Sequence, residues 1–158
     1  MPVIALSQRI AAPIERVFDL ARSIDLHLAS AAATGEQAIA GTTTGLIGPD
    51  GWVTWRARHL LVRQTLTSRI TAYERPHRFE DRMVAGIFAR FIHEHRFRVV
   101  DGGTLMSDRL EYEAQYGPLG RLACGLVVDR HLRRFLTRRN QIIARTADSG
   151  AWRDYLPG

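Results

Sequence analysis

IAAPIERVF, residues 10–18, marks the passage from a strand to a helix near the start of the chain. The apolar run over residues 3–10 is typical of a short strand. Pro13 suits the first turn of a helix, and Glu15 suits the positive end of the helix dipole. Apolar residues then repeat at helical spacing, and a second short helix is expected over residues 24–31. We therefore predict a strand followed by two small helices.

The middle of the chain is predicted to form an antiparallel sheet. Residues 36–40 are expected to be a strand, and residues 41–51, with four glycines and one proline, a loop. Residues 52–112 follow a period of two. The pattern breaks near Gln64 and at residues 74–76, 85–87 and 101–103, which predicts five strands joined by short links, a meander.

One long helix is predicted after this sheet. Residues 119–146 contain no proline and are sufficient for a helix of about 42 Å. Residues 148–158 have the composition of a tail. A chain of 158 residues is the usual size of one domain, so we expect a single domain over residues 1–147.

The order of elements is accompanied by a set of motifs at residues 10–18, 36–48, 53–59, 66–71, 75–76, Phe79, Asp81, Phe91, 93–95, 103–106 and 117–120. Together they resemble the START-like, or SRPBCC, superfamily, which also contains polyketide cyclases/dehydratases and the birch-pollen allergen group. The motifs from residue 75 onward look like a bacterial subgroup labelled cyclase/dehydrase, sometimes mislabelled as a cell-division inhibitor. The resemblance implies an α+β helix-grip fold, in which a curved antiparallel sheet surrounds the long C-terminal helix and leaves an apolar cavity.

The composition excludes several kinds of chemistry. All 22 basic residues are arginine, so mechanisms that need a lysine amine are excluded, including Schiff-base catalysis and the phosphate-binding Walker loop. Cys124 is the single cysteine, which excludes an intrachain disulfide and a zinc ribbon. We expect Cys124 to be a packed helix residue.

The net charge of +6 is concentrated in one segment. Residues 119–147 hold seven arginines and one acid, Asp129, whereas the rest of the chain holds 15 of each. Such a segment is either a solvated helix face or an interaction surface for an acidic partner, a membrane or a nucleic acid. We do not expect nucleic acid as the partner.

Targeting signals are not evident. The first nine residues lack the pattern of a secretory signal, and no run of about 18 apolar residues predicts a transmembrane helix. We therefore expect a cytoplasmic protein. The sequence does not define an oligomeric state.

Alternation also predicts which residues face the inside of the sheet. The apolar face carries five polar residues with it: His59, His93, His95, Asp81 and Asp108. If the turn centres near Gly86, Asp81 lies opposite His93, and His95 follows on the same face. Side chains directly opposite have Cβ atoms about 4.5–5.5 Å apart, so an Asp–His contact is expected.

Three interpretations of this polar group remain open. The side chains could satisfy one another, because an unpaired buried polar group costs about 1–3 kcal/mol. They could instead orient a mostly apolar ligand. They could also bind zinc through His93 and His95, with His59 or Asp81 as third ligand. We expect neither a metal nor a cofactor.

The long helix adds one inward polar residue. Arg139 lies near the middle of its apolar stripe, so we expect it to be buried and either paired with a carboxylate or turned to an anionic ligand group. Arg130, Arg134, Arg138 and Arg145 lie on the other side. The remaining histidines, His27, His77 and His131, are expected on surfaces.

These features predict binding of a lipophilic or aromatic small molecule by a carrier or sensor. The expected ligand-binding residues are Trp55, His59, Asp81, Phe91, His93, His95, Phe97, Tyr112 and Arg139. One alternative is an interaction module that uses the arginine-rich helix face. The other is a cyclase/dehydratase-type enzyme. In that case His93 or His95, paired with Asp81, would act as general base, and Arg139 or Tyr112 would stabilise an enolate.

Overall fold

The computed structural model describes residues 1–115 and 117–158, with the side chains of residues 119–124 excepted. Cys124 falls in that exception, so its predicted packing lies outside the described side chains. The elements in chain order are β1 (Val3–Ile10), α1 (Ile14–Ala21), α2 (Ile24–Ser30), η1 (Ala32–Thr34), β2 (Gln37–Gly41), β3 (Trp52–His59), β4 (Val62–Glu74), β5 (Arg78–Ala85), β6 (Phe88–Val100), β7 (Gly103–Ala114), α3 (Pro118–Asp148) and η2 (Gly150–Asp154).

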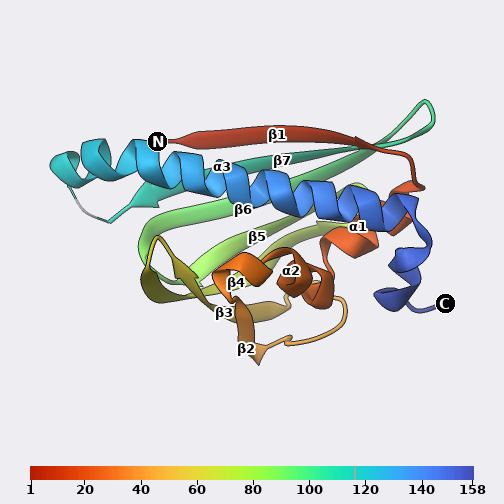
Figure 1. Ribbon diagram of the computed structural model, residues 1–158, viewed down its shortest axis with the longest axis horizontal. Helices are drawn as coiled ribbons and strands as arrows, with labels where there is room; N and C mark the ends of the chain where they lie inside the picture. Colours follow the sequence, from red (N-terminus) through yellow and green to blue (C-terminus); the bar gives the residue numbers. More distant parts are fainter. Residues whose placement is uncertain (116) are drawn as a thin grey trace.

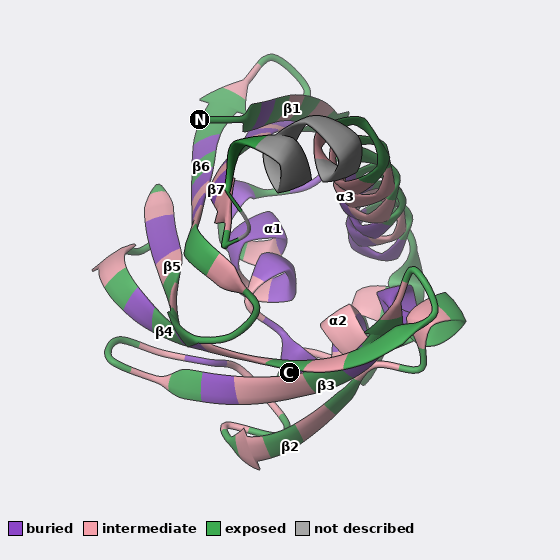
Figure 2. Ribbon diagram, turned by 90° about the vertical axis from the view of Figure 1, so that its left-hand side faces the viewer, coloured by how far each residue is buried: buried purple, intermediate pink, exposed green. Residues whose placement is uncertain are grey.

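The strands form one antiparallel sheet of seven strands in the order β1-β7-β6-β5-β4-β3-β2. Its strands follow one another as neighbours from β2 to β7, and β1 closes the far edge beside β7. Helix α3 lies lengthwise across the sheet (Figure 1). The sheet curves into an arc around the helices, with α1 and α2 inside it (Figure 2). This is the predicted helix-grip architecture.

One predicted strand boundary is wrong. The chain turns at Leu60 and Leu61, not near Gln64, because His59 pairs with Val62 across a two-residue turn. Both leucines have positive φ, 50° and 67°, a backbone region that non-glycine residues rarely adopt. Because leucine is not a typical turn residue, the sequence contains no signal for a turn at this position. Gln64 lies within β4, opposite Ala57.

The larger of two buried groups lies where α1 covers the sheet. Phe18 is completely buried and makes edge-on ring contacts with Tyr73, Phe79 and Phe97 at 5.3–5.5 Å. A second buried group joins β1, β7 and α3 and consists of Ile4, Leu110, Tyr112 and Leu136. Helix α3 contributes Ile143 to the first group and Leu136 to the second, so both groups pack α3 against the sheet.

The residues after α3 fold back onto the domain. Trp152, Tyr155 and Leu156 pack against the core, and the guanidinium of Arg16 lies 4.4 Å from the Trp152 ring centre. Cation–π contacts of this kind contribute about 0.5–1 kcal/mol at exposed sites. The predicted tail therefore contains an ordered helical turn, η2.

Helix α3 is amphipathic along its described part. Arg130, Arg134, Arg138 and Arg145 are exposed, as expected, whereas Leu136, Arg139 and Ile143 are buried. Among the described residues, no helix has the length and apolar character needed to cross a membrane.

Candidate functional site

A pocket of about 500 Å³ lies between α2, the inner face of β3–β7 and α3. Volumes of about 300–1,000 Å³ are usual for sites that bind small organic molecules. Most of its wall is apolar, and the apolar lining includes Val53, Leu66, Ile70, Phe79, Phe88, Leu110, Val128, Leu132, Phe135 and Leu136.

Seven of the nine predicted ligand-binding residues line this pocket: Trp55, His59, Asp81, Phe91, His93, His95 and Arg139. Phe97 and Tyr112 are not among its described lining residues. Phe97 packs against Phe18 beneath α1, and Tyr112 packs in the group beneath α3, where its hydroxyl lies 3.4 Å from Asp129 Oδ1. Both point inward, as alternation predicts, but helices cover them.

The predicted contact across the β5–β6 hairpin is more elaborate than a single pair. Asp81 lies opposite His93 in the sheet, as expected. The hydrogen bonds, however, run to other partners. His95 Nε2 lies 3.3 Å from Asp81 Oδ2, and His93 Nε2 lies 3.0 Å from Asp108 Oδ1. We call Asp81, His93, His95 and Asp108 the His–Asp cluster.

Asp108 lies at the centre of the His–Asp cluster. Its side chain is fully buried, and its Oδ1 lies 2.8 Å from His95 Nδ1. This contact is an ion pair, and His95 Nδ1 has no hydrogen-bond partner among the described residues. The amide of Asn140 donates to the second oxygen, Oδ2. The carboxylate of Asp108 thus has partners from β6 and α3.

The protonation states follow from these contacts. Burial opposes ionisation of Asp108, but its contacts with His93 and His95 hold the pKa well below the usual range. Burial favours neutral His95, but its contacts with Asp108 and Asp81 raise its pKa. Burial also opposes ionisation of Asp81, but its hydrogen bond with His95 and the nearby charges, including Arg139, together lower its pKa. A positively charged His95 between the carboxylates of Asp81 and Asp108 accounts for the direction of all three pKa shifts.

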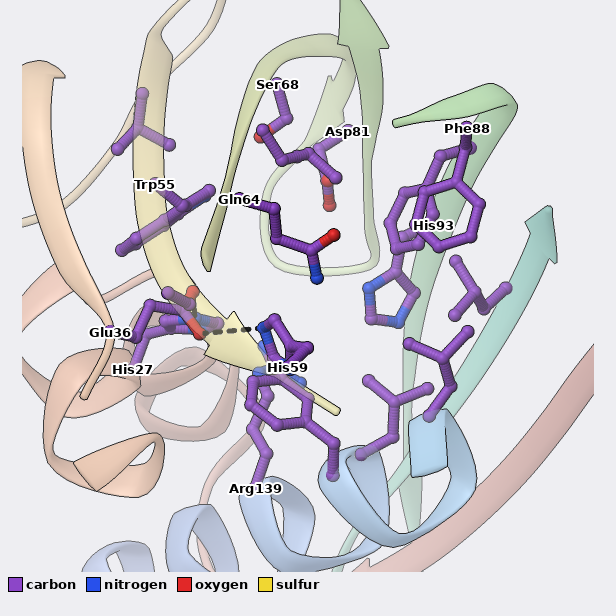
Figure 3. A pocket seen from close by; sticks show the side chains of 18 of the residues that line it. His27, Glu36, Trp55, His59, Gln64, Ser68, Asp81, Phe88, His93 and Arg139 are labelled. Atoms are coloured by element: carbon purple, nitrogen blue, oxygen red, sulfur yellow. Dashed lines mark hydrogen bonds and ion pairs between the residues drawn. The ribbon is translucent and has the colours of Figure 1, made fainter. Parts of the chain in front are cut away.

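His93 differs from His95 in its protonation. Burial and the positive charge of His95 lower the pKa of His93, so its ring is neutral near pH 7. A carboxylate can only accept, so we assign the proton to Nε2, which faces Asp108, and a lone pair to Nδ1. The ring of His93 projects into the pocket (Figure 3). Its Nδ1 can therefore accept a hydrogen bond or a proton from a bound molecule.

Arg139 is buried as predicted, with 5% of its surface exposed. Its Nη2 donates to the carbonyl oxygen of Ala21 at 2.8 Å, and its Nη1 donates to Asn140 Oδ1 at 3.2 Å. Nη1 also lies 3.7 Å from Asp108 Oδ1. Arg139 thus links α3 to the end of α1 and balances one negative charge of the His–Asp cluster.

Asp81, His93 and His95 could together hold a metal ion. Each offers one ligand atom, and these atoms lie within 4.8 Å of one another. Zinc bonds to such nitrogen and oxygen atoms at about 2.0–2.2 Å. To bind there, however, zinc would have to displace the proton by which His95 holds Asp81. His59, the other third ligand considered, contacts His131 instead.

Sequence reasoning missed several polar residues of the pocket, among them His27, Glu36, Gln64 and His131. His27 and His131 were expected on surfaces, but both line the pocket from α2 and α3. Glu36 precedes β2 and pairs with His27 at 2.8 Å. The side chain of Gln64 extends into the middle of the pocket (Figure 3). A helical wheel of α3 could have located His131, because it adjoins the apolar residues Leu132 and Phe135.

The chain is similar to known proteins in sequence and in fold. The family described as polyketide cyclase/dehydrase and lipid transport matches residues 1–148. No match was found among curated protein sequences.

Several solved structures share the fold. TTHA0849 from Thermus thermophilus has a TM-score of 0.72 at 18% identity, covering 92% of this chain and 99% of that one. Ms6760 from Mycobacterium smegmatis has a TM-score of 0.65 at 18% identity, with coverage of 90% and 88%. Major latex-like protein 151 from Panax ginseng has a TM-score of 0.63 at 13% identity, with coverage of 92% and 97%. Structural similarity at such low sequence identity shows a common fold, and a fold alone does not define a function.

Proposed function

The chain belongs to the polyketide cyclase/dehydrase and lipid transport family, and we propose on this basis that it binds a lipophilic or aromatic small molecule as a carrier or sensor. The binding residues in this proposal are Trp55, His59, Asp81, Phe91, His93, His95 and Arg139. Residues 1–147 form the binding domain, residues 148–158 its tail, and the cytoplasm is the expected compartment.

The observation that carries this proposal is the character of the pocket wall. Aromatic and aliphatic side chains from five strands and α3 surround a volume of about 500 Å³. Burial of apolar ligand surface there contributes about 25 cal/mol per Å². The polar residues are fewer than the apolar ones, and six of them are paired with one another: His27 with Glu36, His59 with His131, and His95 with Asp81. They are therefore suited to orienting a ligand whose affinity comes mainly from apolar contact.

Filling the pocket tests this proposal. Ala57 is buried and lines the pocket, so Ala57→Phe should occupy part of the volume. Binding of a naphthalene-based fluorophore should then weaken at least about tenfold, the equivalent of about 1.4 kcal/mol. Ala5→Phe makes the same substitution at an exposed position of β1 and should leave binding unchanged. Equal binding by both variants would place the ligand outside the pocket.

His93 supports a second candidate function, an enzyme of cyclase/dehydratase type. Its neutral ring presents a lone pair on Nδ1 to the pocket, which suits proton abstraction from a carbon next to a carbonyl. Of the two residues considered for stabilising the resulting enolate, only Arg139 is among the described lining residues.

Deuterium exchange tests this second candidate. The methyl ketone of 2-acetylnaphthalene should exchange its protons faster with the protein present. His93→Gln should reduce that acceleration by about 10²–10⁴-fold, the usual contribution of a general base. His77→Gln, at an exposed histidine, should have no effect. If the ketone binds but its exchange is not accelerated, the protein is a carrier or sensor only.

A further inference from the structure

Glu36 has a carboxylate oxygen with no hydrogen-bond partner although it is buried. Only 6% of the Glu36 side chain is exposed, and the residue lines the pocket. Its Oε1 accepts a hydrogen bond from His27 Nε2 at 2.8 Å, so the unpaired atom is Oε2. A buried acceptor without a donor costs about 1–3 kcal/mol or more when charged. This oxygen is therefore suited to receive a donor from a bound molecule.

The nearest described ion-pair partner of this oxygen is His59. His59 Nε2 lies 3.9 Å from Glu36 Oε2, which is marked by the dashed line in Figure 3. Hydrogen bonds of the N–H···O type extend to about 3.2 Å, so these two atoms are not directly bonded. A single oxygen atom to one side of this pair, at the third corner of a triangle, could lie about 2.8 Å from each.

The position of the His59 proton follows from its other contact. His59 Nδ1 lies 2.8 Å from His131 Nε2, so one of these nitrogens must donate to the other. Burial lowers the pKa of both rings, which leaves each with one N–H near neutral pH. If His59 donated from Nδ1, its bare Nε2 would face the bare Oε2 of Glu36. We therefore assign the donor to His131 and an N–H to Nε2 of His59.

The gap is thus bounded by one acceptor, Glu36 Oε2, and one donor, His59 Nε2–H. A hydroxyl group matches this pair, because it donates one hydrogen bond and accepts others. A carbonyl or ether oxygen cannot donate to Glu36, an ammonium cannot accept from His59, and a carboxylate would be repelled by Glu36. Alcohols and phenols are therefore the functional groups that fit.

Rings surround the gap. The ring of His27 lies tilted against Trp55 with ring centres 4.3 Å apart, and Phe135 makes an edge-on contact with His59 at 5.6 Å. Aromatic pairs of this geometry contribute about 0.5–1.5 kcal/mol beyond their buried area. A planar ring that carries the hydroxyl would extend this arrangement.

We propose that Glu36 and His59 form a hydroxyl-binding subsite that selects phenolic ligands for the pocket. The proposal rests on the proposed binding function and adds the chemical class of the ligand. It assigns Glu36 Oε2 as the acceptor of the phenol proton and His59 Nε2 as the donor to the phenol oxygen. Trp55, His27 and Phe135 contact the ring.

Three probes of nearly equal apolar area test this subsite by titration calorimetry: 2-naphthol, 2-methoxynaphthalene and naphthalene. Only 2-naphthol can donate to Glu36. It should bind the protein about 10–100-fold more tightly than the methyl ether, since a hydrogen bond to a charged group contributes about 1.5–3 kcal/mol. Equal binding of all three would overturn the subsite and leave the proposed pocket intact. Failure of all three to bind would overturn both.

Two variants locate the effect. In Glu36→Gln the amide oxygen retains the hydrogen bond from His27, which leaves an NH2 donor in place of the acceptor Oε2. His59→Phe removes the donor while keeping an aromatic ring. Each should reduce the preference for 2-naphthol to about one while naphthalene still binds. Glu15→Gln, at an exposed carboxylate of α1, should retain the preference. If Glu36→Gln does not fold, His59→Phe gives the same measurement. A preference lost in His93→Gln but kept in Glu36→Gln would also overturn the assignment.

Discussion

His95 Nδ1 lies 2.8 Å from Asp108 Oδ1 in a part of the structure where neither side chain has more than 2% of its surface exposed. The other nitrogen of the same ring contacts Asp81. His95 thus carries a proton between two carboxylates, and the guanidinium of Arg139 supplies the second positive charge. With His93 neutral, the four charges balance within the domain core.

Asp108→Asn should destabilise the fold strongly. The substitution removes the anion that pairs with His95 and leaves a buried imidazolium or forces its ring to lose the proton. Removing one partner of a buried ion pair costs about 3–5 kcal/mol, so urea unfolding at pH 7 should show a loss of that size. Asp148→Asn, at an exposed carboxylate, should change the free energy of unfolding by less than about 0.5 kcal/mol. A comparable small loss in Asp108→Asn would argue against a charged His95.

Stability should decrease on the alkaline side of about pH 6.5, the usual histidine pKa. Because the folded-state pKa of His95 is raised, the unfolded chain releases this proton first as the pH rises. The contribution of His95 to the free energy of unfolding is complete below about pH 6.5. It is lost as the pH rises through the pKa of His95 in the folded state. His95→Gln should therefore flatten the alkaline side of a plot of unfolding free energy against pH.

At acid pH, stability should depend on three other histidines, whose pKa values are shifted in the opposite direction. The pKa values of His93, His59 and His131 are lowered in the fold. The unfolded chain therefore gains their protons first as the pH falls below about 6.5, and stability decreases. The free energy of unfolding, measured from denaturation curves across about pH 5–9, should therefore have a maximum within this range. His77→Gln serves as the control, and a maximum that moves in this control variant would contradict the assignment to the buried histidines.

Arg139→Lys should also destabilise, although it conserves the charge. Arginine uses two nitrogens at once here, one toward Ala21 O and one toward Asn140 and Asp108. A lysine ammonium is a point charge and cannot reproduce that fork. We expect a loss of about 1–3 kcal/mol in unfolding free energy, the cost of leaving a buried polar group unpaired. Arg138→Lys, on the exposed face of the same helix, should be nearly neutral, and equal effects of the two substitutions would refute the prediction.

Much of the fold could be predicted from the sequence because its signals are local. IAAPIERVF contains both the strand end and the helix start, and alternation by two placed Asp81, His93, His95 and Asp108 on one face. Strand alternation also brought Asp81 opposite His93. It could not tell which inward residues reach the pocket, since Phe97 and Tyr112 are covered by α1 and α3 through the curvature of the sheet.

The second polar wall of the pocket could not be predicted by the same reasoning. His27, Glu36 and His131 come from α2, the residue before β2, and α3, so only the tertiary arrangement brings them to His59. None of these positions follows a period shared with the others. The pairing of His59 with His131 spans 72 residues of sequence, and no local pattern encodes it.

The Leu60–Leu61 turn allows a stabilising substitution. Leu61 is 89% exposed, has a φ of 67° and is not among the described lining residues of the pocket. The left-handed region costs a residue with a Cβ atom about 1–2 kcal/mol, and glycine adopts it freely at a smaller entropic cost. Leu61→Gly should therefore raise the free energy of unfolding by about 0.5–1 kcal/mol. Leu126→Gly is the matched comparison, because Leu126 is 83% exposed but lies within α3, where glycine costs about 1 kcal/mol. Urea unfolding should move the two variants in opposite directions, and destabilisation of both would show that the turn carries no strain.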